Sequence, residues 1–172
     1  SEEEELKRRV DEVRKRTKEI IEELKRHVDR NERTVREIIK RLEEEVRRVA
    51  EKVKRGELDR EELRELIKRI DEKLKKTLDD VRKHLEDSLR RIEDILRRHE
   101  EESKKIEDDM RREVKNSKVV EDVRRTLKRL NDELRKVVKD ARELHERLLR
   151  DLKRVIDRIR ERLKRLLDEA EK

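Results

Sequence analysis

Residues 54–62 have the sequence KRGELDREE and contain the one glycine of a 172-residue chain that has no proline. Glycine is favoured in the left-handed position that follows a helix end, so Gly56 predicts where one helix stops. Asp59 is a favoured N-cap residue, and Glu62, three positions later, can complete a capping box with it. This stretch therefore predicts a tight turn between two helices.

A second turn is predicted within residues 115–118, which have the sequence KNSK. We expect Asn116 to adopt the left-handed conformation and Ser117 to cap the helix that follows. No other internal stretch carries such signals, so the chain should contain three helices and two short turns.

The helices are predicted at about 2–55, 60–115 and 118–171, within a single domain over residues 1–172. Glutamates open the first helix, which suits the positive end of its dipole. Short turns make neighbouring helices antiparallel. The predicted fold is therefore all-α, an up-down-up three-helix bundle of the coiled-coil type with helices of about 55 residues.

The composition alone would favour disorder, because 61% of the residues are charged and only 30% are hydrophobic. The apolar residues nevertheless recur at steps of three and four, the spacing of a helix bundle. In the first predicted helix this apolar stripe runs through positions 6, 10, 13, 17, 20, 24, 27, 31, 34, 38, 42, 46, 49 and 53. Three such stripes can bury one another, so we expect a monomer; the alternative is an oligomer that covers part of the stripe.

Polar residues interrupt the apolar stripes, and all four histidines of the chain lie on or beside them. Assuming equal rise per residue, level positions have numbers that add up to about 115 across the first turn and about 233 across the second. One predicted polar layer contains His27, Asn31, His84, Ser88 and His145, and the other contains Thr17, His99, Ser103 and Asn131. Thr34 and Thr77 also lie on the stripes. Burying a polar group without a hydrogen-bond partner is costly, so residues within one layer should be partners of each other. The nine residues of the two layers are therefore the candidate site.

The layers have three interpretations. They can serve only to fix the topology of a very stable scaffold. They can form a pH switch, because desolvation lowers the pKa of a buried imidazole and acid then favours the unfolded chain. They can also hold a metal or a haem between facing histidines, although no Asp, Glu or Cys on the stripes completes a zinc site.

Taken together, the idealised long helices, the two turns at Gly56/Asp59 and Asn116/Ser117, the absence of aromatic residues and the polar layers resemble a known class. This class comprises de novo designed helical bundles with buried histidine hydrogen-bond networks that disassemble on acidification. The resemblance covers the whole chain. It implies a synthetic protein with no natural function that is destabilised at endosomal pH, and some members of the class permeabilise membranes in acid.

The end of the third predicted helix suits such membrane activity. Residues 147–167 carry nine basic and three acidic residues. Their apolar face consists of Leu148, Leu149, Leu152, Val155, Ile156, Ile159, Leu163, Leu166 and Leu167. A cationic amphipathic helix of this kind can bind an anionic membrane surface, which we expect here only at low pH.

Other classes of function find little support. We expect no enzyme and no cofactor, because no nucleophile with a base and no phosphate-binding loop can be recognised. Acidic residues are interleaved with the basic ones and no aromatic residue can stack on bases, so we expect no nucleic-acid partner and require no other partner. No apolar run approaches the length of a membrane span, and the acidic Ser1–Glu5 does not resemble a signal peptide. We expect a soluble protein without a targeting signal, made in the cytoplasm of a recombinant host.

Overall fold

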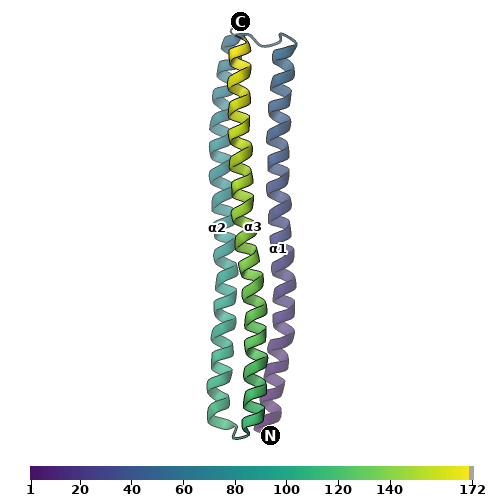
Figure 1. Cartoon of the computed structure of the whole chain (residues 1–172), viewed down its shortest axis with the longest axis vertical. Coiled ribbons are helices and arrows are strands. Elements are labelled where there is room, and N and C mark those ends of the chain that lie inside the picture. Colours follow the sequence, from purple (N-terminus) through teal and green to yellow (C-terminus); the bar gives the residue numbers. More distant parts are fainter. Residues whose placement is uncertain (171–172) are drawn as a thin grey trace. The chain divides into compact units, whose positions relative to one another are not determined.

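The structure, a computed structural model, describes residues 1–170 and contains three helices (Figure 1). These are α1 (Glu2–Lys54), α2 (Arg60–Glu113) and α3 (Ser117–Ala170). The predicted all-α three-helix bundle is confirmed. The observed bounds differ by one or two residues from the approximate predicted ones at the end of α1, the end of α2 and the start of α3, and predicted residue 171 lies outside the described residues.

The turn between α1 and α2 forms as predicted. Gly56 has a φ of 72°, and the amides of Gly56 and Glu57 donate to the carbonyl oxygens of Val53 and Lys52, a Schellman motif. At the start of α2, the amide of Glu62 donates to Asp59 Oδ1 at 2.8 Å, and the amide of Asp59 faces Glu62 Oε1 at 3.5 Å. The hydrogen bond from the Glu62 amide lowers the pKa of the Asp59 carboxyl.

The turn between α2 and α3 differs from the prediction. Asn116 is not left-handed, because no described residue other than glycine has a positive φ. Its side-chain oxygen instead accepts hydrogen bonds from the amides of Lys118 at 3.1 Å and Val119 at 3.5 Å. Asn116 is therefore the N-cap of α3, and Ser117 is the first residue of the helix.

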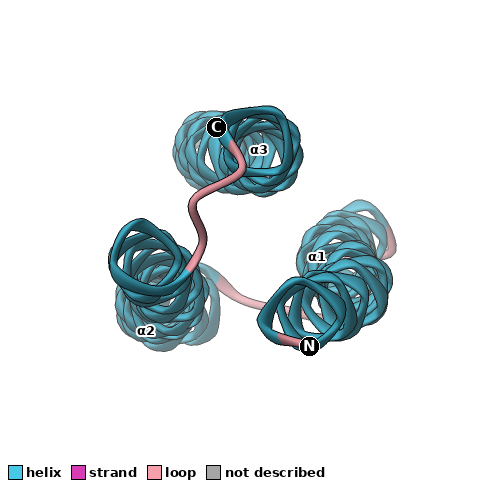
Figure 2. Ribbon diagram, turned by 90° about the horizontal axis from the view of Figure 1, so that it is seen from below, coloured by secondary structure: helices cyan, strands magenta, loops and turns pink. Residues whose placement is uncertain are grey.

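Contacts between residues divide the chain into two compact units. The first unit comprises Ser1–Asp29 and Asp87–Glu143, and the second comprises Arg30–Glu86 and the described part of Leu144–Lys172. Each unit thus contains one segment of every helix. Figure 2 draws the described residues as helices joined by loops. The single domain expected over residues 1–172 stays a prediction.

In the first unit, ion pairs show how the segments are aligned. Arg9 pairs with Asp109 and Arg16 with Glu102, so residue numbers fall on α2 as they rise on α1. The two segments are therefore antiparallel. Their apolar cluster consists of the buried residues Leu6, Val10, Val13, Ile106, Met110, Val114, Val123, Leu127 and Leu130.

The second unit has the same arrangement. Lys73 of α2 pairs with Glu45 of α1 at 2.8 Å, and Arg160 of α3 pairs with Asp71 of α2 at 2.8 Å. Its apolar cluster consists of Val35, Ile39, Leu42, Val46, Val49, Leu63, Ile70, Leu74, Val81, Leu85, Leu148, Leu152, Val155, Ile156, Ile159 and Leu163.

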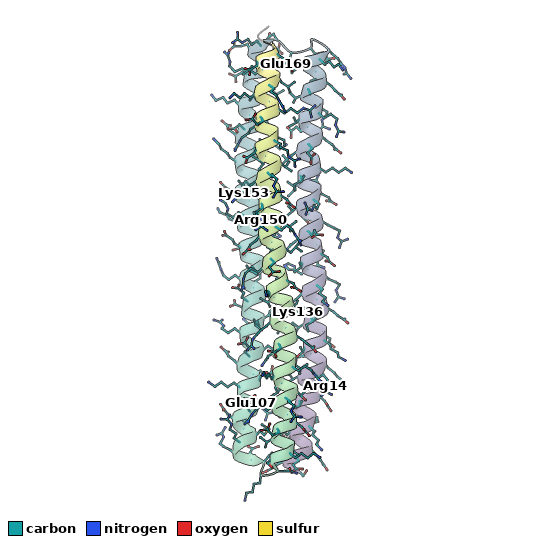
Figure 3. All side chains as sticks on the ribbon, in the orientation of Figure 1. Arg14, Glu107, Lys136, Arg150, Lys153 and Glu169 are labelled. Carbon is teal, nitrogen blue, oxygen red and sulfur yellow. The ribbon has the colours of Figure 1, made fainter. Side chains whose placement is uncertain are left out.

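Charged side chains cover the outer faces of the helices (Figure 3); the labelled Lys136 and Lys153 of α3 are both exposed. Among the described residues no large hydrophobic side chain is exposed. Over residues 1–170, no helical stretch combines the length and the apolar character that crossing a bilayer requires.

Candidate functional site

The first unit holds a network of four polar side chains from all three helices. His99 of α2 is 5% exposed, and its Nε2 lies 2.6 Å from Oγ1 of the fully buried Thr17 of α1. The other ring nitrogen, Nδ1, lies 2.6 Å from Oδ1 of Asn131 on α3. Ser103, one turn beyond His99, donates to the same Asn131 oxygen at 3.3 Å. The predicted layer of Thr17, His99, Ser103 and Asn131 is thus brought together.

The hydrogen-bond roles around His99 follow from its partners. Asn131 Oδ1 is an acceptor, so His99 Nδ1 donates to it. The single hydrogen of the Thr17 hydroxyl is donated to the carbonyl oxygen of Val13 at 2.7 Å, so Nε2 also donates, to the Thr17 oxygen. A neutral ring has only one N–H, so with a neutral ring the Thr17 hydroxyl or the Asn131 amide takes the other orientation.

The carbonyl group of Val13 was missed by sequence reasoning. The available signal was the position of Thr17 four residues later on the same helix, since a threonine hydroxyl inside a helix often bonds the carbonyl oxygen of residue i−4.

A second histidine of the first unit has a serine partner. His27 of α1 is half-buried, and its Nε2 lies 2.5 Å from Oγ of the buried Ser88 on α2. The register estimated from the first turn placed these two residues level, and the structure brings them together.

The second unit contains a triad with Asn31 between two imidazoles. Asn31 is 4% exposed, and its Oδ1 lies 3.1 Å from Nε2 of His84 on α2. Its Nδ2 lies 3.3 Å from Nε2 of His145 on α3, which is 3% exposed. Asn31 and His145 therefore meet in the interior of this unit, and His84 contacts Asn31 from an exposed position.

Two predicted interior positions require correction. His84 and Thr34 are exposed, although both were placed on the apolar stripes. In each case the next residue, Leu85 or Val35, is the buried one. Because successive helix positions differ by about 100°, burying the later residue turns the earlier one outward. His84 reaches the triad only through its Nε2 atom. Thr77 is half-buried.

The five residues expected in one layer fall in both units: His27 and Ser88 in the first, and Asn31, His84 and His145 in the second. Within the described part of the chain, no group of three His, Cys, Asp or Glu side chains is placed to hold a metal ion. The interpretation as a metal site therefore gains no set of three ligands from the described residues.

The apolar face expected to bind membranes lies inside the second unit. Its members that are buried are Leu148, Leu152, Val155, Ile156, Ile159 and Leu163. Leu149, Leu166 and Leu167 are partly buried and pack against the same cluster. In the folded state this face is therefore covered by α1 and α2.

Comparison with solved structures finds a likeness in fold. No protein-family model and no curated protein matches the chain. Among solved structures, the chain is similar to one described as a computationally designed three helix bundle, with 16% sequence identity and a TM-score of 0.40. The alignment covers 98% of this chain and 85% of that chain.

Proposed function

We propose that the chain is a designed three-helix bundle whose histidine networks act as a pH-responsive conformational switch, destabilised in mild acid. The observation that supports this proposal most directly is the contact between Asn31 and His145. With the Asn31 amide in this orientation Nδ2 is the donor, so Nε2 of the buried His145 is the acceptor. A proton on that nitrogen would set two donors against each other and would leave a charge in the apolar interior, both of which are costly.

The direction of the effect follows from proton linkage. Where the folded state resists protonation, the unfolded chain binds more protons in the pH range just below the ordinary histidine pKa of about 6.5. The stability is then complete above this pH and falls as the pH falls below it. Each unit of lowered proton affinity corresponds to about 1.4 kcal/mol for one fully protonated histidine.

The test is guanidinium unfolding, followed by circular dichroism, at pH 7.5 and at pH 5.0. We expect the free energy of unfolding to be lower at pH 5.0 by at least about 1.4 kcal/mol. A control in which His27, His84, His99 and His145 are all replaced by Asn should lose this dependence. Equal stability of the parent at both pH values, or the same loss in the histidine-free control, would refute the switch.

Membrane disruption is the proposed consequence of opening. It is supported by the covered apolar face of α3 in the second unit and by the excess of basic over acidic residues in 147–167. The test is dye leakage from vesicles of mixed anionic and neutral lipids at pH 5.0 and 7.5, with purely neutral vesicles as the control. Leakage that is equal at the two pH values would separate membrane binding from the switch.

A second candidate is a scaffold in which the polar residues only fix the alignment of the helices. It is favoured by the first-unit network, where both ring nitrogens of His99 have acceptor partners and acid costs no hydrogen bond. The same unfolding experiment distinguishes the two, because a plain scaffold keeps its stability from pH 7.5 to pH 5.0.

A further inference from the structure

The Asn31 side chain restricts which Nε2 atom of its two histidine partners can carry a hydrogen. A side-chain amide offers an acceptor at its oxygen and donors at its nitrogen. Oδ1 faces Nε2 of His84 and Nδ2 faces Nε2 of His145. In this orientation His84 Nε2 carries a hydrogen and His145 Nε2 carries none.

Rotating the amide by half a turn exchanges these roles but does not remove the conflict. With the oxygen toward His145, that ring can donate, and the amide nitrogen then requires a bare Nε2 on His84. Neither orientation lets both Nε2 atoms donate. Two protonated rings therefore always place one N–H against another at Asn31, which forfeits a buried hydrogen bond.

The two histidines differ in how easily they can carry the first proton. His84 is exposed, so water can solvate its charge, whereas His145 is 3% exposed. His84 already donates from Nε2 and takes up its second proton on Nδ1. Its bond to Asn31 Oδ1 then becomes charge-assisted and stronger.

We propose that Asn31 couples the two histidines antagonistically: the proton on His84 holds the amide in the orientation that opposes protonation of His145. His84 is then the first of the pair to be protonated, and His145 is the group whose protonation opens the second unit. The latter step rests on the proposed function, whereas the coupling through the amide does not.

Charged groups border the triad on each helix segment. The half-buried ones are Glu32 on α1, Arg82 on α2 and Asp151 on α3. Arg82 pairs with Asp79, and Asp151 pairs with Arg36 of α1 at 2.8 Å. Glu32 lies one turn before Arg36, on the face of α1 toward α3 and His145.

Among the described residues, no metal-binding group of three His, Cys, Asp or Glu side chains includes His84 and His145. The bordering charges are the same in every variant below, so their effect on His145 cancels when the variants are compared.

The test compares two replacements of the exposed His84. His84→Trp removes the titrating ring but keeps one uncharged N–H donor, with no acceptor, the same number of bonds from the backbone as Nε2, so the Asn31 oxygen stays held. His84→Leu removes the charge and the donor together. Simple repulsion between charges predicts the same result for both variants, because neither carries a charge at this position.

The measured quantity is the pH midpoint of His145 protonation, followed through the nitrogen-15 shifts of its ring by nuclear magnetic resonance. We expect His145 in His84→Trp to be protonated at a pH lower by about half a unit or more than in His84→Leu, an approximately threefold difference in proton affinity. In the parent, the His84 signals should shift at higher pH than those of His145.

Equal His145 midpoints in the two variants, a lower midpoint in His84→Leu, or protonation of His145 before His84 in the parent would each overturn the coupling. Circular dichroism at pH 7.5 verifies that both variants fold. The proposed function fails separately, if the parent is equally stable at pH 7.5 and 5.0 while the difference between the variants persists.

Discussion

The Nε2 atom of His99 lies 2.6 Å from the hydroxyl oxygen of Thr17, and the same hydroxyl lies 2.7 Å from the carbonyl oxygen of Val13. Thr17 is fully buried, so water cannot replace it in either contact. The hydroxyl therefore links the imidazole of His99 on α2 to the backbone of α1. Its removal measures how much this link contributes to the free energy of unfolding.

Replacement of Thr17 by Val keeps the shape of the side chain and removes the hydroxyl. We expect the free energy of unfolding at pH 7.5 to fall by about 1–3 kcal/mol, because His99 Nε2 is left buried without its partner. Guanidinium unfolding measures the change. The matched control is Thr126→Val, since Thr126 only bonds the carbonyl oxygen of Asp122 at a partly exposed position, and a change within about 0.5 kcal/mol is expected there. Equal effects of the two variants would contradict the network.

Asp71 provides a prediction at a pH below the range in which histidines change protonation. The hydrogen bond from the Arg160 guanidinium lowers the pKa of the Asp71 carboxyl. A lowered folded-state pKa stabilises the fold above the ordinary aspartate value of about 3.9, and this contribution is lost as the pH falls through the folded value. Asp71→Asn should therefore lower stability equally at pH 7 and pH 5, by at most about 1 kcal/mol because the pair is partly exposed, and the difference should shrink as the pH falls below about 3.9. Unfolding across pH 3–7 checks this, with the exposed Asp157→Asn as the control. A difference that changed between pH 7 and 5 would contradict the assignment.

Gly56 tests the turn between α1 and α2. An added Cβ would meet nothing within 4 Å, so the cost of Gly56→Ala is conformational only. We expect a loss of about 1–2 kcal/mol from placing a residue with a side chain at a φ of 72°. Gly56→Asn should cost less, because asparagine tolerates the left-handed region. The comparison is made by thermal or guanidinium unfolding, and a stabilising Gly56→Ala would show that this φ is not kept.

The N-cap of α3 can be assigned by a pair of alanine variants. Asn116→Ala removes the oxygen that accepts from the amides of Lys118 and Val119, and a loss of about 1 kcal/mol is expected. Ser117→Ala should change stability by no more than about 0.5 kcal/mol, because Ser117 already lies within the helix. The reverse order of the two effects in unfolding experiments would make Ser117 the cap.

The parts of the fold that could be predicted from the sequence depend on short-range chemistry. Gly56 marked the end of α1 because few other residues adopt its φ, and Asp59 with Glu62 marked the start of α2 because their bonds join near neighbours. The contacts of His27 with Ser88 and of Asn31 with His84 followed from counting residues away from that turn.

The errors arose where packing decides between neighbouring residues. Asn116 and Ser117 are both good N-cap residues. The choice depends on where α2 ends, and Val114, just beyond that end, packs in the apolar cluster of the first unit. Likewise, His84 is exposed because its neighbour Leu85 is the buried residue. A pattern of apolar residues at steps of three and four does not decide which of these two neighbours is buried.

The chain divides into two units and has no tryptophan or tyrosine. Single tryptophan substitutions can therefore measure whether the two units unfold cooperatively. A single tryptophan in place of the half-buried Ile95 would be the sole fluorophore of the first unit, and one in place of Leu78 would be that of the second. Coincident fluorescence transitions in the two proteins would mean that the units unfold together, and separated ones would mean that each melts on its own. An acid-triggered opening confined to the triad of the second unit would then be visible as a change in the Leu78→Trp protein alone.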